Sequence, residues 1–387
     1  MRSAYNETSL YNLMVVKEAK RWWKHSLISS DQFNAIREVY KSQLFHPNFI
    51  IRILLFIATQ FALGGVSGLF FLFLGGIGED GLSIASIFYG IGTFFFLKYI
   101  FINNHHFKSG VTEALLYHAI AYTLGGLMVL ADFNVHFVFI ISIIALTFAA
   151  IRYLDLVTTF LAILTFAGMI FYEFYTMGGL FKQIIPFVFI LSFTPIYFIT
   201  KRIKTRYEFK FWTHNLLIVE SISLLLIYFA GNYLVVRELS INMMDLVLEE
   251  GQVIPFAIIF LALTVLIPIA YLYFGIKNKD VVLLRVSLMV IAFSVFTFKY
   301  YYGFGHPEIT LTVAGAMLLI IAYVLFNYLK ILRNGFTREN LLSEKWAEAN
   351  IQAFVVSQTL GGNQIKTDNG FKGGGGEYGG GGASGSF

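Results

Sequence analysis

Ten apolar stretches of at least 18 residues are the feature that most constrains how this chain of 387 residues can fold. A helix rises 1.5 Å per residue, so roughly 20 apolar residues are needed to cross about 30 Å of hydrocarbon. Lipid offers no partner to backbone amides, and the alternating pattern of a membrane β-barrel is absent, so each stretch is predicted to be a membrane-spanning helix. The stretches cover residues 50–74, 82–102, 112–131, 134–151, 154–176, 183–200, 212–234, 253–275, 281–301 and 309–329.

The composition supports this interpretation and excludes several others. Hydrophobic residues make up 57% of the chain and charged residues only 13%, which is not typical of soluble domains. The net charge of +5 is spread between the apolar stretches, so nucleic-acid binding is not expected. There is no cysteine, and no HExxH, Walker A or dinucleotide-binding motif, so neither a metal nor a cofactor is expected. The predicted fold class is all-α, a polytopic transmembrane helix bundle of about ten spans.

The positions of lysine and arginine predict the orientation, because basic loops stay on the cytoplasmic side. With a cytoplasmic N-terminus, only Lys182, Arg237 and Lys299 of the 28 basic residues lie outside. This asymmetry predicts cytoplasmic ends and an extracytoplasmic loop at 235–252, and leaves open one further pair of short helices. Because the first apolar stretch begins only near residue 50, no cleaved signal peptide is expected, and a bacterial inner membrane is the expected location.

Polar segments are predicted on both sides of the bundle, which itself covers 48–332. Residues 1–47 are expected to form a helical hairpin, since Ser29-Ser30-Asp31-Gln32 is typical of a helix N-terminus. Residues 333–360 are expected to form an amphipathic helix, and the glycine-rich residues 361–387 to be disordered. The apolar stripe that would dock this last helix onto a protein surface consists of Leu342, Trp346, Ala349, Ala353, Val356 and Leu360.

The hairpin also carries a family resemblance. With Trp22-Trp23, then Leu27 to Gln32, then Ile36 to Tyr40, ahead of a glycine-bearing first span, the chain resembles an uncharacterised family of bacterial predicted membrane proteins over residues 10 to about 170. Members of that family often carry a Gly-Gln pair in the middle spans, where this chain has Gly125-Gly126. The tail, residues 379–387, is similar to the glycine-rich tails of TPM-domain membrane proteins. The resemblance implies a domain of unknown function.

Ionisable residues inside the spans are the main candidates for function, because a charge at the bilayer centre is costly. Glu220 lies deepest, with His214 in the same span, and Arg285 at similar depth is its expected counter-charge. Glu220 and Arg285 are interpreted as a structural ion pair or, together with His214, as a proton relay. For ionisable residues nearer to the span ends, snorkelling or headgroup water is expected to lower the cost of placing a charge in the membrane. These residues are Lys98, Glu113, Asp155, Glu173 and Lys299.

One short motif has two interpretations. Gly65-Val66-Ser67-Gly68 matches the GxSG of rhomboid intramembrane proteases, in which the serine needs a histidine base. His118 is one of the histidines that such a base would require. Gly64 and Gly68, four residues apart, are more simply a small-residue face for helix packing, and this interpretation is preferred.

These observations favour a non-enzymatic membrane scaffold. The N-terminal hairpin and the C-terminal helix would offer surfaces to a protein partner or to a second copy, with the lipid bilayer as the main surroundings. The alternative is a transporter of a small solute or a proton-coupled substrate, with Glu220 and Arg285 lining a cavity. An intramembrane enzyme is the third hypothesis.

Overall fold

The chain divides into two compact units. The computed structural model describes residues 3–244 and 252–302, together with eight isolated positions between 312 and 327. One unit comprises Met1–Met14 and Lys41–Leu341, and the other comprises Val15–Tyr40 and Leu342–Phe387. The bundle belongs to the first unit, and the described part of the second is a helical hairpin.

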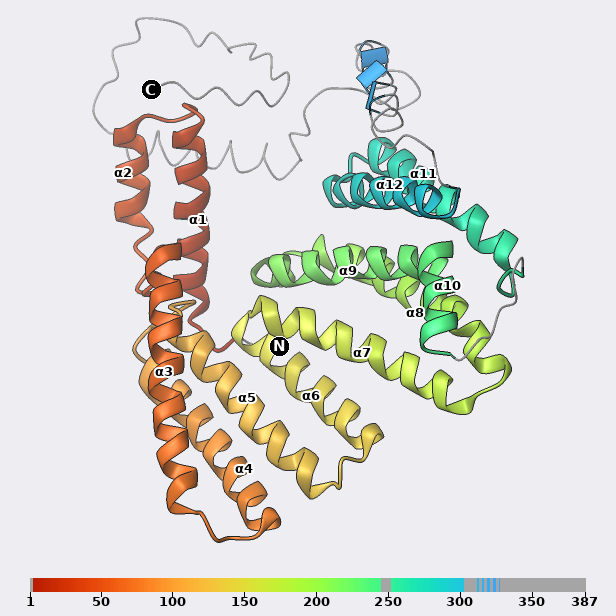
Figure 1. Cartoon of the computed structure of the whole chain (residues 1–387). Helices are drawn as coiled ribbons and strands as arrows, with labels where there is room; N and C mark the ends of the chain where they lie inside the picture. The colour runs from red at the N-terminus through yellow and green to blue at the C-terminus, as the bar shows by residue number, and fades with distance from the viewer. Residues whose placement is uncertain are drawn as a thin grey trace, which may run out of the picture. The chain divides into compact units, whose positions relative to one another are not determined.

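The regular elements of the described residues are helical (Figure 1), and the only β-pairing among those residues is an isolated bridge between Phe45 and His106. In chain order the helices are α1 (Glu7–Lys24), α2 (Ser30–Val39), α3 (Phe49–Phe73), α4 (Glu79–Phe96), α5 (Val111–Leu130), α6 (Val135–Tyr153), α7 (Leu156–Met177), α8 (Leu180–Lys204), α9 (Thr213–Gly231), α10 (Tyr233–Asn242), α11 (Ala257–Lys277) and α12 (Val281–Tyr302). A π-helical turn at Leu97–Ile102 extends α4, and a 3₁₀ turn at Tyr207–Trp212 precedes α9.

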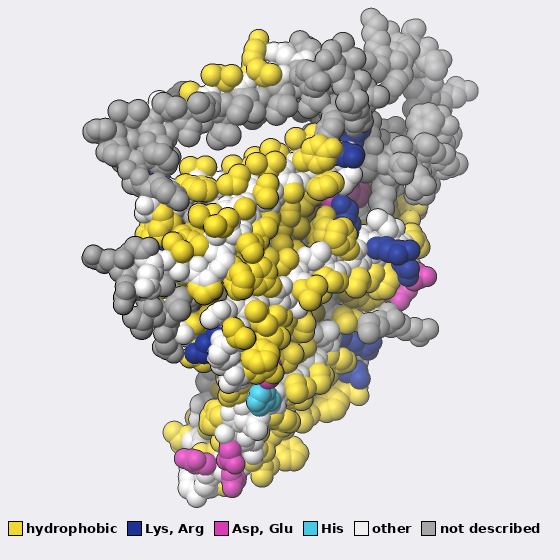
Figure 2. Space-filling view, turned by 90° about the vertical axis from the view of Figure 1, so that its right-hand side faces the viewer, with side chains coloured by type: hydrophobic (Ala, Val, Ile, Leu, Met, Phe, Trp, Pro, Cys, Tyr) yellow, Lys and Arg dark blue, Asp and Glu magenta, His cyan; other side chains and the backbone are white. Residues whose placement is uncertain are grey.

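Nine helices in the described part of the chain are long and apolar enough to cross a membrane. They coincide with the first nine predicted spans to within a few residues; the first, expected at 50–74, is α3 at Phe49–Phe73. Figure 2 shows a face on which hydrophobic side chains predominate, as expected for a surface that meets lipid. The all-α polytopic bundle is therefore confirmed. Only eight positions of the tenth predicted span, 309–329, are among the described residues, so this span is not tested.

Two helices occupy central positions in the bundle. α5 packs against α3, α4 and α6, and α9 packs against α7, α8, α10, α11 and α12 (Figure 1). Their spans are the most buried of the nine, whereas none of the most apolar stretch of α3 is buried. Any polar side chain on the inner face of α5 or α9 is thus removed from lipid and must find a protein partner.

Two glycines allow α4 and α5 to approach closely, but they are not Gly64 and Gly68, which were predicted to form a helix-packing face. Gly64 and Gly68 are exposed on α3, and a Cβ added to either would meet no atom within 4 Å in the described part of the chain. A Cβ on Gly90 would instead lie 2.8 Å from the carbonyl oxygen of Ala119, and one on Gly126 would lie 2.5 Å from that of Ser83. Among the described residues no helix packs on the predicted face, because α3 turns these glycines outward and its buried Ser67 inward.

The hairpin has a core of its own. Ala19 and Trp22 of α1 are buried against Ile36 of α2. Ser29 caps α2 by accepting a hydrogen bond from the Gln32 amide, while the Gln32 side chain accepts one from the Ser29 amide. This capping box is the arrangement that the Ser-Ser-Asp-Gln sequence predicts. The amphipathic helix and the tail predicted beyond residue 333 lie outside the described residues.

One described helix was not expected. The loop predicted at 235–252 contains α10, and α9 stops at Gly231 instead of continuing to residue 234. Asn232 is extended at the junction, and its side chain accepts a hydrogen bond from the Val235 amide, which caps α10. The side-chain nitrogen of Asn232, Nδ2, also donates to Tyr228 Oη at 2.9 Å and to Thr297 Oγ1 at 3.0 Å. Local capping and these buried bonds stabilise the break.

Candidate functional site

Glu220 is the most deeply placed charge in the described part of the bundle. It lies seven residues after the start of α9, roughly 10 Å along the helix. Its central position on α9 leaves it completely buried, and it forms an ion pair with Lys204 at the last turn of α8. One carboxylate oxygen, Oε1, and the hydroxyl of Ser223 one turn further on are both buried and without a hydrogen-bond partner in the described structure.

A second ion pair lies one turn away on α8. Lys201 Nζ is 2.7 Å from Asp280 Oδ2 and donates to Tyr197 Oη at 3.2 Å. Asp280 precedes α12 and accepts hydrogen bonds from the amides of Val282 and Leu283. Burial alone raises the pKa of Asp280, but the hydrogen bonds from Lys201 and the Leu283 amide outweigh it, so the pKa is lowered. We call Lys201, Lys204, Glu220 and Asp280 the charge cluster; it joins α8 to α9 and to the start of α12.

The prediction that Arg285 is the partner of Glu220 was wrong. Arg285 is exposed on α12, and the carboxylate binds Lys204 instead. The sixth span was predicted to end at residue 200, which assigned Lys204 to a loop, whereas α8 continues to Lys204 and its long side chain reaches inward. His214 is exposed at the first turn of α9 and lies six residues before Glu220, so the two side chains are on different faces of the helix.

Another buried acid lies in the other half of the bundle. Glu113, at the first turn of α5, is 2.5 Å from Arg52 of α3 and accepts hydrogen bonds at 2.8 Å from the Gly110 amide and from Thr112 Oγ1. Asp155 caps α7 through the Thr158 amide and accepts a bond from Tyr117. Both carboxylates are buried, so protein donors rather than headgroup water compensate for their burial, which corrects the sequence-based expectation.

The GxSG motif does not assemble a serine–histidine pair. Ser67 Oγ donates to the Gly64 carbonyl of its own helix, at 3.1 Å. His118 Nε2 lies instead 3.3 Å from Tyr89 Oη of α4. A base must be within hydrogen-bonding distance of the nucleophile, and no hydrogen bond joins these two side chains in the described structure.

His105 and His106, which are adjacent in the sequence, do not form a metal site with His118. His106 packs between the rings of Phe45 and Phe101, and burial lowers the pKa of its imidazole, which favours the neutral form. His105 is exposed in the same loop, and His118 belongs to α5. Within the described part of the chain no group of three histidine or acidic side chains is close enough to hold a metal ion.

The fold and these buried, paired charges define an integral membrane protein of the polytopic α-helical class. No known protein family, curated protein or solved structure matches the chain. Its function must therefore be inferred from its own residues and geometry.

Proposed function

We propose that this chain is a non-enzymatic membrane scaffold, whose bundle anchors the Val15–Tyr40 hairpin on the cytoplasmic side for binding to a protein partner. The observation that supports this proposal is that the hairpin belongs to a compact unit separate from the bundle and has its own core around Trp22. An independent core allows a surface to keep its shape without help from the spans. The cytoplasmic location rests on the basic residues, all but three of which fall on one side.

The hairpin offers apolar side chains at its surface. Leu27, in the turn between α1 and α2, is 61% exposed, and Val39 at the end of α2 is 54% exposed. Trp23 is stacked on Phe33 with ring centroids 5.4 Å apart, and its ring is also exposed. Tryptophan is enriched among the residues that carry most of the binding energy at protein–protein interfaces, so Trp23 is the expected anchor, with Leu27 and Val39 beside it as apolar contact area.

A photo-crosslinking amino acid at Leu27, introduced into the full chain in native membranes, tests the scaffold function. We expect one protein adduct of defined mass at this position, and only lipid adducts from the same amino acid at Phe61, which is exposed on α3. Val39→Asp should abolish the protein adduct without changing the thermal stability of the bundle. Absence of any protein adduct at Leu27, or an adduct that Val39→Asp leaves unchanged, would overturn the proposal.

A specific observation favours a second candidate, a proton-coupled transporter. Glu220 Oε1 and Ser223 Oγ are buried and have no hydrogen-bond partner among the described residues, and ionisable side chains inside a membrane mark ion pathways and proton relays. Purified protein in liposomes would report this activity as proton movement that Glu220→Gln abolishes. Lys299→Gln, which alters an exposed residue of α12, is the control. Equal proton permeability of loaded and empty liposomes would exclude this candidate.

A further inference from the structure

The hydroxyl group of Ser223 differs from other buried hydroxyl groups of the described spans. Five of these donate a hydrogen bond to a carbonyl three or four residues earlier on their own helix, namely those of Ser67, Thr93, Thr159, Thr264 and Ser287. Ser223 is completely buried, but its hydroxyl has no partner among the described residues. Leaving a buried hydroxyl unbonded is costly, so its position requires an explanation.

Glu220 places an open carboxylate oxygen on the same face of α9. It precedes Ser223 by three residues, a spacing at which side chains are neighbours on a helix surface. Its Oε2 binds Lys204, whereas its Oε1 is buried without a hydrogen-bond partner among the described residues. In Asp280, the other acid of the charge cluster, one oxygen binds Lys201 and the other accepts from two backbone amides. Of the two acids, Glu220 is therefore the one with an oxygen left for a proton.

A single proton on Oε1 would provide a partner for both groups. A carboxylate only accepts hydrogen bonds, but a protonated carboxyl group also donates one, and a serine hydroxyl can accept it. A neutral Glu220 no longer attracts the ammonium group of Lys204. Lys204 is the last residue of α8 and 21% of its side chain is exposed, so the ammonium group can turn into water. The same residues thus allow two arrangements, an ion pair with Lys204 or a hydrogen bond to Ser223.

The other ionisable groups around Glu220 leave Lys204 as its direct partner. The groups that surround it are Lys204, Lys201 and Tyr197 of α8, Asp280 before α12, and Tyr271 of α11. The second lysine contacts the aspartate and donates to the α8 tyrosine, and the α11 tyrosine donates to a backbone carbonyl of α9. Arg285 of α12 is exposed. The ionisable residues of α7 lie near its ends, and those of α10 lie beyond Gly231.

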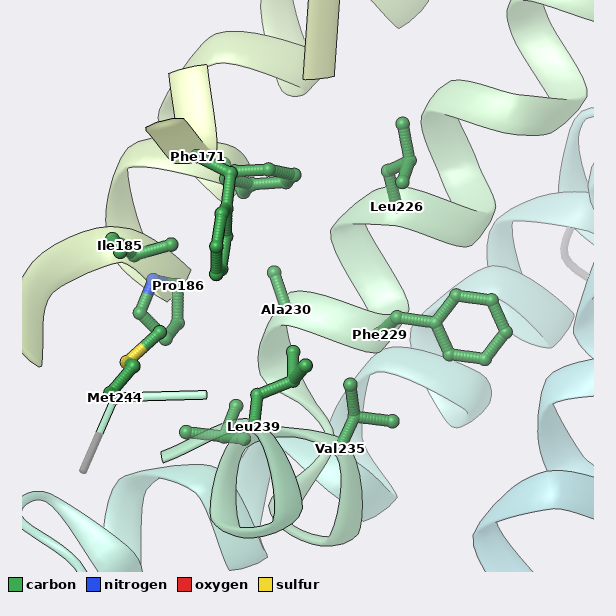
Figure 3. A pocket seen from close by; sticks show the side chains of 11 residues that line it. Phe171, Ile185, Pro186, Leu226, Phe229, Ala230, Val235, Leu239 and Met244 are labelled. Carbon is green, nitrogen blue, oxygen red and sulfur yellow. The ribbon is translucent and has the colours of Figure 1, made fainter. Parts of the chain in front are cut away.

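The two sides of Glu220 along α9 differ in their access to water. One turn beyond Ser223, Leu226 lines an apolar cavity of about 150 Å³ among α7, α8, α9 and α10. Figure 3 shows its hydrophobic lining, with side chains of α7 and α8 facing those of α9 and α10. A cavity with such walls stays free of water and offers no hydrogen-bonding group. Exchange with water therefore takes place at the Lys204 end, where the lysine side chain is partly exposed.

We propose that Glu220 is a proton-binding site, in which Ser223 accepts the hydrogen bond of the bound proton and Lys204 is displaced by it. One proton passes from water at the end of α8 to Oε1, the carboxyl group becomes neutral, and its O–H donates to Ser223 Oγ. The ammonium group of Lys204 keeps its own protons and turns into water. Release of the proton reverses these steps. The proposal rests on the proton-coupled candidate function for its role, whereas the site can be tested without transport.

Infrared difference spectra of the purified full chain in detergent, titrated from about pH 8 to about pH 4, measure the carboxylic acid band of Glu220. We expect a band that Glu220→Gln removes, or that Glu220→Asp moves if the glutamine variant does not fold. Its midpoint should fall by about 1 pH unit in Ser223→Ala, because the protonated form loses its hydrogen-bond acceptor. Ser223→Thr keeps a hydroxyl and should restore the midpoint. Ser287→Ala removes a buried hydroxyl that is already bonded, and it should change nothing.

Labelling with an amine-reactive reagent at constant pH measures the displacement of Lys204. Glu220→Gln is neutral like the protonated acid, so the labelling rate of Lys204 should rise roughly tenfold, the factor expected for loss of a hydrogen bond between charged groups. Lys201 keeps its pair with Asp280 and is the control within the same protein, so its labelling rate should not change.

Each part of the proposal can fail separately. Absence of a Glu220 band throughout the titration would overturn the proton site, and a midpoint that is constant or rises in Ser223→Ala would overturn the role of Ser223. An unchanged labelling rate of Lys204 would overturn the exchange. Glu220-dependent proton movement in liposomes without these results would keep the transporter and reject this site. The infrared and labelling results without proton movement would keep the site and reject the transporter.

Discussion

The carboxylate of Glu220 and the ammonium group of Lys204 form an ion pair that joins the middle of α9 to the last turn of α8. Glu220 is fully buried, whereas 21% of the Lys204 side chain is exposed. The two partners therefore differ in their access to water. Lys204 can turn toward water if its partner is removed, but Glu220 has no such alternative.

This inequality predicts an asymmetric response to mutation. Lys204→Met should lower the free energy of unfolding by about 3 kcal/mol, because a buried carboxylate then loses its cation. Glu220→Gln should cost less, since it removes the buried charge itself. Thermal unfolding in detergent measures both, and Arg202→Met, which removes an exposed cation from the same turn of α8, is the control. If Lys204→Met is no more destabilising than this control, the pair does not stabilise the bundle.

The Lys201–Asp280 pair predicts a dependence of stability on pH. Because the pKa of Asp280 is lower in the folded protein than in the unfolded chain, its contribution is complete above the unfolded pKa of about 3.9 and is lost as the pH falls through the folded value. Asp280→Asn should therefore be less stable at pH 7, by about 1 to 2 kcal/mol. The variant should also lose less stability than the parent between pH 5 and pH 3. Parallel pH profiles for variant and parent would contradict the assignment.

Helix packing by glycine predicts a clear contrast between two similar substitutions. Gly126→Ala should destabilise the protein by about 1 to 3 kcal/mol, because the new methyl group would overlap the carbonyl of Ser83 on α4. Gly64→Ala should be neutral or stabilising by up to about 1 kcal/mol, since alanine favours the helix and meets no neighbour in the described structure. Thermal unfolding of the two variants checks this, and similar melting temperatures would contradict it.

The sequence predicted elements well where one physical constraint dominates. Each span must be apolar over its whole length, so the positions of α3 to α9, α11 and α12 follow from hydrophobicity alone. The helix start at Ser29-Ser30-Asp31-Gln32 is likewise local, and it was predicted correctly. Neither required knowledge of which helices are neighbours.

The candidate site was harder to predict because it depends on tertiary contacts. Glu220 was identified as a costly buried charge, but choosing Lys204 over Arg285 requires knowing where α8 ends and which face of α12 is buried. The helix break at Asn232 lacks proline, and its stabilising partner Thr297 lies 65 residues away. One signal was present: an Asn following Gly231 inside an apolar stretch is typical of a helix end.

The orientation of the bundle gives the last prediction. The C-terminal turns of α8 and α11 carry Lys201, Arg202, Lys204 and Lys277, and these turns should face the cytoplasm because positive charge is retained there. A reporter active only outside the cytoplasm should therefore be active when fused after Gly178, in the turn between α7 and α8, and inactive when fused after Lys279. The short α10 adds a stricter condition. Its 10 residues span roughly 15 Å, too little to cross about 30 Å of hydrocarbon, so a fusion after Met244 should be active as well. Activity after Lys279, or inactivity after both Gly178 and Met244, would reverse the proposed orientation, and it would place the Val15–Tyr40 hairpin outside the cell.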